Sequence, residues 1–165
     1  MKSVFKYLYK SRIIKILLLG VFIPLLMNFT IAGIQVLLGI GDSDSNDIYT
    51  VSVKDFVLVV LICPFIETYF FQYTPLRAAR TYAKKHKYAY CYAIIISSII
   101  FGLLHMWSIT HIFIAFFYGF IWAICCFIFM RRKIKHAVLL TGMIHACYNC
   151  ILFGMAILFD FNFDN

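Results

Sequence analysis

The ionisable and amide side chains that interrupt the apolar runs of this chain are few, and their spacing indicates one shared site. Glu67 is the only glutamate and stands in "CPFIETYFFQYT" (63–74), whereas the six aspartates lie in polar segments. His105 closes a second apolar run, and His145 and Asn149 lie in a third, four residues apart on one helix face. A charge in mid-bilayer costs about 2.5–3.5 kcal/mol, so such groups are expected to be functional. One carboxylate and two imidazoles can carry protons or ligate a divalent ion.

Each of these residues also has a purely structural explanation when it is taken alone. An interhelical hydrogen bond of about 0.6 kcal/mol accounts for a single His145 or a single Asn149. Glu67 is harder to explain in this way, because its own apolar run contains no basic residue. Its natural partners are the histidines of other helices. Because three separate runs each contribute such groups, the sequence favours a shared polar site.

The elements that must position these residues are membrane-spanning helices. The 165-residue chain is 64% hydrophobic and only 13% charged, far from the composition of a soluble domain. Five apolar stretches approach the length of about 20 residues that a helix needs to cross the hydrocarbon. The predicted fold class is therefore all-α, a polytopic transmembrane helical bundle of about five spans. The predicted spans run from Ile13 to Ile40, Val57 to Tyr73, Tyr88 to Met106, His111 to Met130 and Ala137 to Phe159.

The charged residues between the spans predict an orientation. Of the 15 lysines and arginines, 14 precede the first span, stand at its start (Lys15) or lie in the second and fourth connections, and all six aspartates fall on the opposite side. The positive-inside rule then predicts a multi-pass plasma-membrane protein with a cytoplasmic amino terminus and an extracytoplasmic carboxyl terminus. The net charge of +8 is read as a topology signal and as attraction to anionic lipid, so no nucleic-acid partner is expected.

Three regions are expected along the chain. Residues 1–54 would form a retained signal-anchor helix followed by a polar extracytoplasmic linker, "GIGDSDSNDIYTVSVKD" (39–55). Residues 55–159 would form the membrane core, and residues 160–165 a short tail. The six cysteines all lie inside predicted spans and are interpreted as packing residues. "HACYNC" (145–150) lacks the second ligand pair that a zinc–thiolate site requires.

Three short motifs give the core a family resemblance. Pro64 and Glu67 form Pro-x-x-Glu, "SSIIFGLLH" (97–105) contains Phe101 and His105, and "GMIHACYN" (142–149) contains His145 and Asn149. Their order, on three different helices, resembles the CPBP family of intramembrane proteases. This family is also called the Abi or CAAX-protease-like family and includes the Ras-converting CAAX endopeptidase. Bacteriocin processing or immunity is among the roles that the resemblance implies.

The first motif departs from the family pattern at two positions. The family usually carries Glu-Glu-x-x-x-Arg, but Thr68 stands at the second glutamate and Gln72 at the arginine. These positions are four apart and would normally form an acid–base pair along one helix face. Their joint replacement by neutral residues leaves neither charge without a partner. Either a supporting pair has been exchanged around a working catalytic glutamate, or the site has moved toward a non-catalytic role.

The resemblance implies a peptidase that hydrolyses a peptide bond inside the bilayer with a Glu67-activated water. His105 would help to hold that water, and His145 and Asn149 would form an oxyanion hole; Thr68, Gln72 and Phe101 would support the site. No cofactor is expected. The less favoured alternative is a divalent metal such as zinc, held by Glu67, His105 and His145.

The depths of these residues in the membrane do not agree in the sequence alone. Counted from the cytoplasmic ends of the predicted spans, Glu67 and His145 lie about nine or ten residues deep, and His105 about seventeen. The difference corresponds to about 10 Å along a helix. His111 is expected either to cap the site or to lie at the interface. Trp107 and Trp122 are interpreted as interfacial anchors or packing residues.

Three functions of different classes remain open. The first is an intramembrane peptidase acting on a peptide or a membrane-anchored protein. The second is a non-catalytic CPBP-like membrane protein that acts in immunity or binds a partner. The third, a transporter that uses Glu67 as a proton carrier, is least favoured because no repeat or pair of broken helices is present.

Overall fold

The computed structural model describes residues 7–39, 52–82, 86, 88–106 and 108–160, without the side chains of residues 159 and 160. Every long regular element in this part of the chain is helical. Most of the polar linker expected at 39–55, the tail after residue 160, and Trp107 lie outside the described residues. The predicted all-α membrane bundle is confirmed, because four of its helices are long and apolar enough to cross a bilayer.

Those four helices differ in their bounds from the predicted spans. They cover Ile13–Leu37, Val53–Tyr82, Ile109–Arg131 and Ala137–Leu158. The first is α2, the third is α7, and the fourth belongs to α8 (Ala137–Asp160). The remaining apolar helix, α6 (Ala89–Leu103), has 15 residues, fewer than the ~20 that cross the hydrocarbon alone. The prediction of a third span from 88 to 106 was therefore too long.

The second span is a continuous helix of 30 residues that changes its winding along its length. It consists of α3 (Val53–Phe56), η1 (Val57–Ile62), α4 (Cys63–Glu67), η2 (Thr68–Tyr73) and α5 (Thr74–Tyr82), where η1 and η2 are π-helical. A capping box at Ser52 and Asp55 starts it. π-Helical turns inside α-helices are frequently found at functional sites. Here they flank the segment that contains Glu67.

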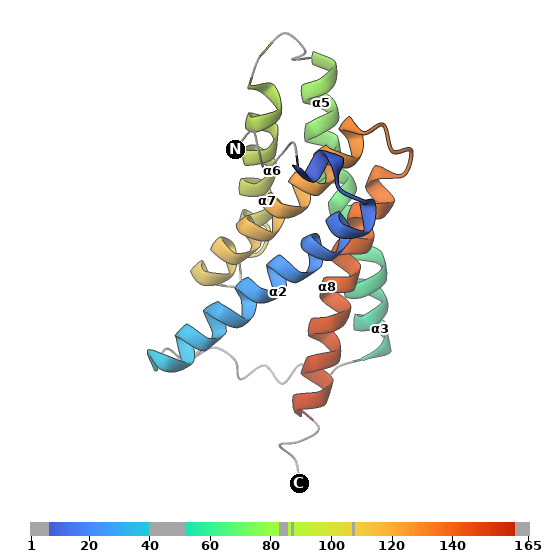
Figure 1. The fold of residues 1–165 in the computed structure, drawn as a ribbon. Helices are drawn as coiled ribbons and strands as arrows, with labels where there is room; N and C mark the ends of the chain where they lie inside the picture. The colour runs from blue at the N-terminus through green and yellow to red at the C-terminus, as the bar shows by residue number, and fades with distance from the viewer. Residues whose placement is uncertain (1–6, 40–51, 83–85, 87, 107, 161–165) are drawn as a thin grey trace.

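This long helix removes the depth conflict seen in the sequence. The prediction that the second span ends at Tyr73 was wrong, because the helix continues to Tyr82. Glu67 lies fifteen residues before that end, and His105 lies sixteen residues after Ala89, the first residue of α6. In Figure 1 the ends of α5 and α6 extend together beyond the turn between α7 and α8. Glu67 and His105 are thus at similar depth.

The core lies where α2, α7 and α8 meet the second span. α6 packs against α7, and α2 crosses over α7 and α8 (Figure 1). Aromatic side chains fill the centre, with Phe101, Trp122 and Phe129 almost completely buried. Large apolar side chains on the outside of the bundle, such as Phe22, Phe70 and Phe113, are exposed. This distribution fits a surface that faces lipid.

Candidate active site

A cavity of about 530 Å³ lies inside the bundle and brings together residues from all three sequence motifs. Its walls are mainly apolar. The carboxyl, imidazole and amide side chains that border it are few: Asn28, Glu67, His105, His111, His145 and Asn149. All four predicted catalytic residues therefore line one space. An apolar cavity with a small number of convergent polar groups is the usual form of a binding or catalytic site.

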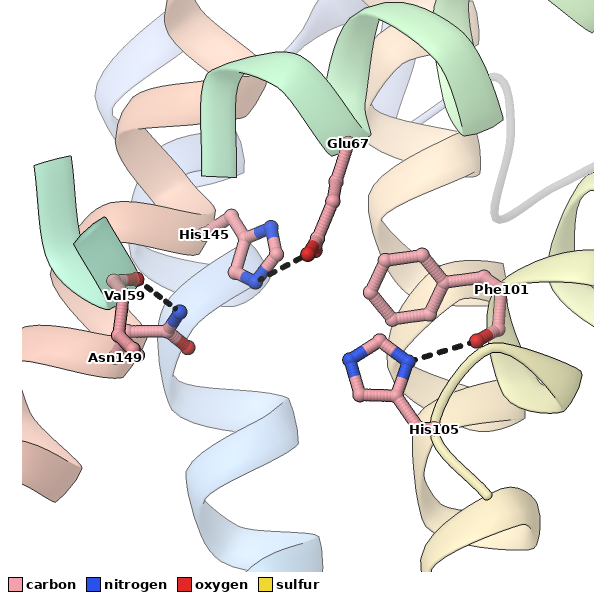
Figure 2. Close-up of polar contacts among 6 residues, drawn as sticks. All are labelled: Val59, Glu67, Phe101, His105, His145 and Asn149. Carbon is pink, nitrogen blue, oxygen red and sulfur yellow. Dashed lines mark hydrogen bonds and ion pairs between the residues drawn. The ribbon is translucent and has the colours of Figure 1, made fainter. Parts of the chain in front are cut away.

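Glu67 and His145 face each other across this cavity. Glu67 is the last residue of α4, and His145 lies two turns into α8. Glu67 Oε2 is 3.8 Å from His145 Nε2 (Figure 2). The Glu67 side chain is 26% exposed and that of His145 only 4%, so the carboxylate is the more accessible of the two.

A glycine allows α8 to come this close to α4. A Cβ atom on Gly142 would lie 2.5 Å from Cδ1 of Phe65, far inside normal contact distance. Gly142 is three residues before His145, and Phe65 is two residues before Glu67. The small residue therefore sets the spacing of the helices that carry the Glu67–His145 pair.

His105 lies just after α6 and faces the same space from the opposite side. Its Nδ1 is 2.8 Å from the carbonyl oxygen of Phe101. A carbonyl only accepts hydrogen bonds, so Nδ1 must carry the hydrogen, and Nε2 is then the acceptor of the neutral ring. Figure 2 shows this Nε2 directed toward the side of the site occupied by Glu67 and His145. The Phe101 ring packs against the His105 ring, with ring centroids 4.6 Å apart, and supports it.

Asn149 is held by a backbone carbonyl that a proline leaves without its helical donor. In the π-helical turn the Cys63 N–H donates to Leu58, five residues earlier. In the same register Pro64 would pair with Val59, but proline has no N–H. Asn149 Nδ2 donates to the Val59 carbonyl at 2.9 Å (Figure 2). The first and third sequence motifs are thus connected by a hydrogen bond, and one N–H of Asn149 is already engaged.

Two aromatic rings contact His145, and only one of them, Phe101, belongs to a sequence motif. The Trp122 indole stacks on the imidazole with ring centroids 3.9 Å apart, and the Phe101 ring meets it edge-on at 5.8 Å. Trp122 also lines the cavity and is 1% exposed, so its interpretation as an interfacial anchor was wrong, whereas packing was right. Its position near the middle of α7, far from either membrane surface, was the available signal.

Other cavity residues were also missed or left open in the sequence. Asn28 and Tyr118 line the cavity and belong to no motif, and Tyr148 lines it from within the third motif. His111 is exposed and borders the cavity, and its backbone N–H donates to Ser108 Oγ at the start of α7.

Thr68 and Gln72 are buried next to the site without bordering the cavity as the structure describes it. Both are 0% exposed. The Thr68 hydroxyl and both polar atoms of the Gln72 amide have no hydrogen-bond partner among the described residues. Unpaired polar atoms of this kind reduce stability by about 1–3 kcal/mol each. Thr68 and Gln72, which replace the family's usual charged pair, are therefore packed in the protein interior beside Glu67 and do not face the cavity.

The described residues contain no group of three His, Cys, Asp or Glu side chains close enough to hold a metal ion in this arrangement. Glu67, His105 and His145 border the same cavity but do not form such a cluster. The six cysteines are free thiols, of which Cys125 and Cys126 are buried.

Comparison with protein families connects this geometry to a known group. The family model described as "Type II CAAX prenyl endopeptidase Rce1-like" matches residues 50–151, which include every motif residue from Pro64 to Asn149. The chain belongs to this Rce1-like family. No curated protein and no solved structure matches the chain significantly.

Membership of the Rce1-like family confirms the resemblance inferred from the three motifs. The family is one of CAAX-type endopeptidases, so the chain is an intramembrane protease of this general type. Its substrate is a membrane-anchored peptide or protein in the bilayer. The long apolar helices make the protein itself an integral membrane protein. The first helix, α2, lies outside the matched residues.

Proposed function

We propose that this Rce1-like protein hydrolyses a peptide bond with a water molecule activated by Glu67. The observation that carries the proposal is the convergence of Glu67, His105, His145 and Asn149 on one cavity, from the two helices α4 and α8 and the turn that follows α6. The walls of that cavity are otherwise largely apolar. Low-dielectric surroundings make a carboxylate a stronger base, and water-excluding walls strengthen electrostatic interactions inside.

The proposed reaction starts with removal of a proton from water by the Glu67 carboxylate. His105 Nε2, the acceptor nitrogen of that ring, takes a hydrogen bond from the same water and orients it. The hydroxide adds to the peptide carbonyl carbon, and the carbonyl oxygen becomes an oxyanion. Protonated Glu67 then returns the proton to the leaving amine as the C–N bond breaks, so the enzyme ends in its starting state.

The oxyanion would receive hydrogen bonds from α8. His145 Nε2 lies 3.8 Å from Glu67 Oε2, which is longer than a hydrogen bond, so the ring nitrogen is not committed to the carboxylate and is the donor proposed for the oxyanion. Asn149 donates one N–H to Val59, so its second N–H is the one proposed for the oxyanion. Each donor of this kind contributes about 2.7–4 kcal/mol in enzymes where one has been removed.

The proposed orientation places the amino terminus in the cytoplasm and the carboxyl terminus outside. Arg80 on α5 borders one surface pocket together with Arg131, the last residue of α7, and Lys133 in the turn after it, so these charges lie at the same end of the bundle. Asp55 lies at the opposite end of the second span. This separation of charge follows the positive-inside rule.

Replacement of Glu67 by Gln tests the proposal directly. The probe is a farnesylated fluorogenic peptide ending in C-a-a-X, since the family name specifies prenyl substrates, compared with the same peptide without the farnesyl group. In detergent micelles, Glu67→Gln should lower cleavage about 10²- to 10⁴-fold. Ile66→Val, a lipid-exposed neighbour on the same helix, should cleave like the wild type.

Two outcomes would change this mechanism. Equal cleavage by wild type and Glu67→Gln would remove Glu67 from the chemistry. Loss of cleavage after addition of a chelator, restored by a divalent ion, would replace the metal-independent route with one in which Glu67, His105 and His145 are ligands. A non-catalytic CPBP-like protein would show no cleavage beyond that of Glu67→Gln with any of the peptides.

A further inference from the structure

The first helix, α2, makes its closest contacts at the candidate site although it lies outside the family match. It packs against α7 and α8, the helices that carry Trp122 and His145 (Figure 1). A helix that only anchored the protein would need apolar contact and no particular register. Besides its apolar contacts, α2 makes two hydrogen bonds with α7, and both involve residues of the cavity.

The first contact arises from a proline in the middle of α2. Pro24 has no N–H, so the carbonyl of Gly20, four residues earlier, lacks its normal helical donor. The indole Nε1 of Trp122 donates to that carbonyl at 3.1 Å, in a buried position. The hydrogen bond satisfies a backbone group that would otherwise be costly in an apolar interior. It also fixes the position and rotation of the indole ring.

Gly20 also allows a close approach at the same point. A Cβ atom there would lie 2.8 Å from Cγ2 of Ile144, the residue before His145. Any larger side chain would push α2 away from α8. The backbone of α2 is therefore in direct contact with the turn of α8 that presents the imidazole.

The second contact lies one turn away on α7. Tyr118 donates its hydroxyl hydrogen to Asn28 Oδ1 at 3.1 Å, and both residues line the cavity. Tyr118 and Trp122 are four residues apart, so they lie on one face of α7, and their rings are 5.9 Å apart. Two donors on this face thus hold α2 in one register.

We propose that Trp122 is a positioning residue for His145 and that α2 is an integral part of the active site. The indole, fixed through the carbonyl that Pro24 leaves open, stacks on the imidazole and sets its orientation. His145 is 4% exposed, and within the described residues its Nδ1 makes no hydrogen bond. The stacked ring is thus a principal constraint on its orientation. This inference rests on the proposed role of His145 as an oxyanion donor.

Replacement of Pro24 by Ala separates positioning from folding. The substitution restores a backbone N–H that donates to the carbonyl of Gly20. That carbonyl then no longer depends on the Trp122 indole for a hydrogen-bond donor. Because alanine is favoured over proline inside a helix, the thermal midpoint should not fall. The kcat for the farnesylated peptide should nevertheless drop about tenfold with KM nearly unchanged, because a misplaced donor affects mainly the transition state. Leu26→Ala, exposed on the same helix, is the matched control.

Combining Pro24→Ala with Trp122→Phe tests whether Pro24 affects kcat through the hydrogen bond between Trp122 and Gly20. Phenylalanine keeps a ring against His145 but cannot donate to Gly20. Trp122→Phe should lower kcat by a similar factor, and adding Pro24→Ala should cause little further loss, because both changes remove the same hydrogen bond. If the losses in kcat of the two single variants multiply in the double variant, Pro24 acts through the shape of α2 alone, and the proposal is overturned.

A fluorescence measurement makes the test independent of proteolysis. The chain has two tryptophans, so Trp107→Phe leaves Trp122 as the only emitter. In that background both Pro24→Ala and His145→Gln should change the emission of the full-length protein, because the first alters the indole N–H and the second its stacked neighbour. Unchanged emission in Pro24→Ala refutes the positioning role. Changed emission combined with full cleavage by Glu67→Gln refutes the proposed function and leaves the positioning contact intact.

Discussion

The hydrogen bond from Asn149 to Val59 should be energetically coupled to Pro64, and a double-mutant cycle can measure the coupling. Asn149→Ala removes the side-chain donor from the Val59 carbonyl. Pro64→Ala supplies a backbone N–H in this part of the helix. If the π-helical register persists, the new N–H at position 64 donates to Val59; if the helix returns to α-helical register, the N–H of Cys63 does. The carbonyl gains a donor in either case.

The expected magnitude follows from where the carbonyl lies. Val59 is 46% exposed and borders the largely apolar cavity, where few groups can donate a hydrogen bond. Interhelical hydrogen bonds in membranes average about 0.6 kcal/mol and reach about 1.7 kcal/mol. The loss of a hydrogen bond that leaves a carbonyl without a donor should lie near the upper end of this energy range. We therefore expect Asn149→Ala to lower the free energy of unfolding by ~1.5 kcal/mol when Pro64 is present and by nearly nothing in the Pro64→Ala background. For a chain of this size ~1 kcal/mol corresponds to about 2–4 °C in the thermal midpoint.

The buried thiols provide the assay. Cys125 and Cys126 react with a fluorogenic thiol reagent only when the bundle opens, so the increase of fluorescence on heating in micelles reports unfolding. Pre-labelling of the exposed thiols with a membrane-permeant maleimide removes their background. The four proteins are wild type, Asn149→Ala, Pro64→Ala and the double variant. The same loss of stability from Asn149→Ala with and without Pro64 would refute the inference that Pro64 creates the acceptor for Asn149.

Further consequences of the structure can be checked in the same way. Gln72→Leu should raise the thermal midpoint, because it removes two buried polar atoms that have no partner among the described residues, and Thr68→Val should be neutral or stabilising; a fall of several degrees in both would show that unrecognised partners satisfy them. Gly142→Ala should lower both stability and cleavage, since its Cβ would overlap Phe65, and Phe65→Ala in the same chain should restore stability; no rescue would place the effect of Gly142 elsewhere. In the folded protein a membrane-permeant maleimide should label Cys91, Cys147 and Cys150 faster than Cys125 and Cys126, as peptide mass mapping can show, and equal rates would contradict the described packing.

Most of the candidate site could be predicted from the sequence because an apolar chain makes polar residues conspicuous. Glu67, His105, His145 and Asn149 are expensive in a bilayer unless they share a site, and they do line one cavity. Trp122 could not be recognised in this way, because an aromatic residue in an apolar helix has no such cost. Thr68 and Gln72 were expected to support the site; they are buried beside it without bordering the cavity.

Hydropathy and charge in the sequence determined the class of the protein, the number of long helices to within one, and which side chains could do chemistry. These properties are local: each depends on composition along a single stretch of chain. Tertiary structure decided the depth of each residue, because the second helix continues through polar residues to Tyr82, where hydropathy alone ends it at Tyr73. It also decided which side chain donates to the carbonyl left open by Pro24 and which to the carbonyl left open by Pro64. Proline's missing N–H is visible in the sequence, but Asn149 and Trp122, 90 and 102 residues away from their acceptors, become partners only through packing.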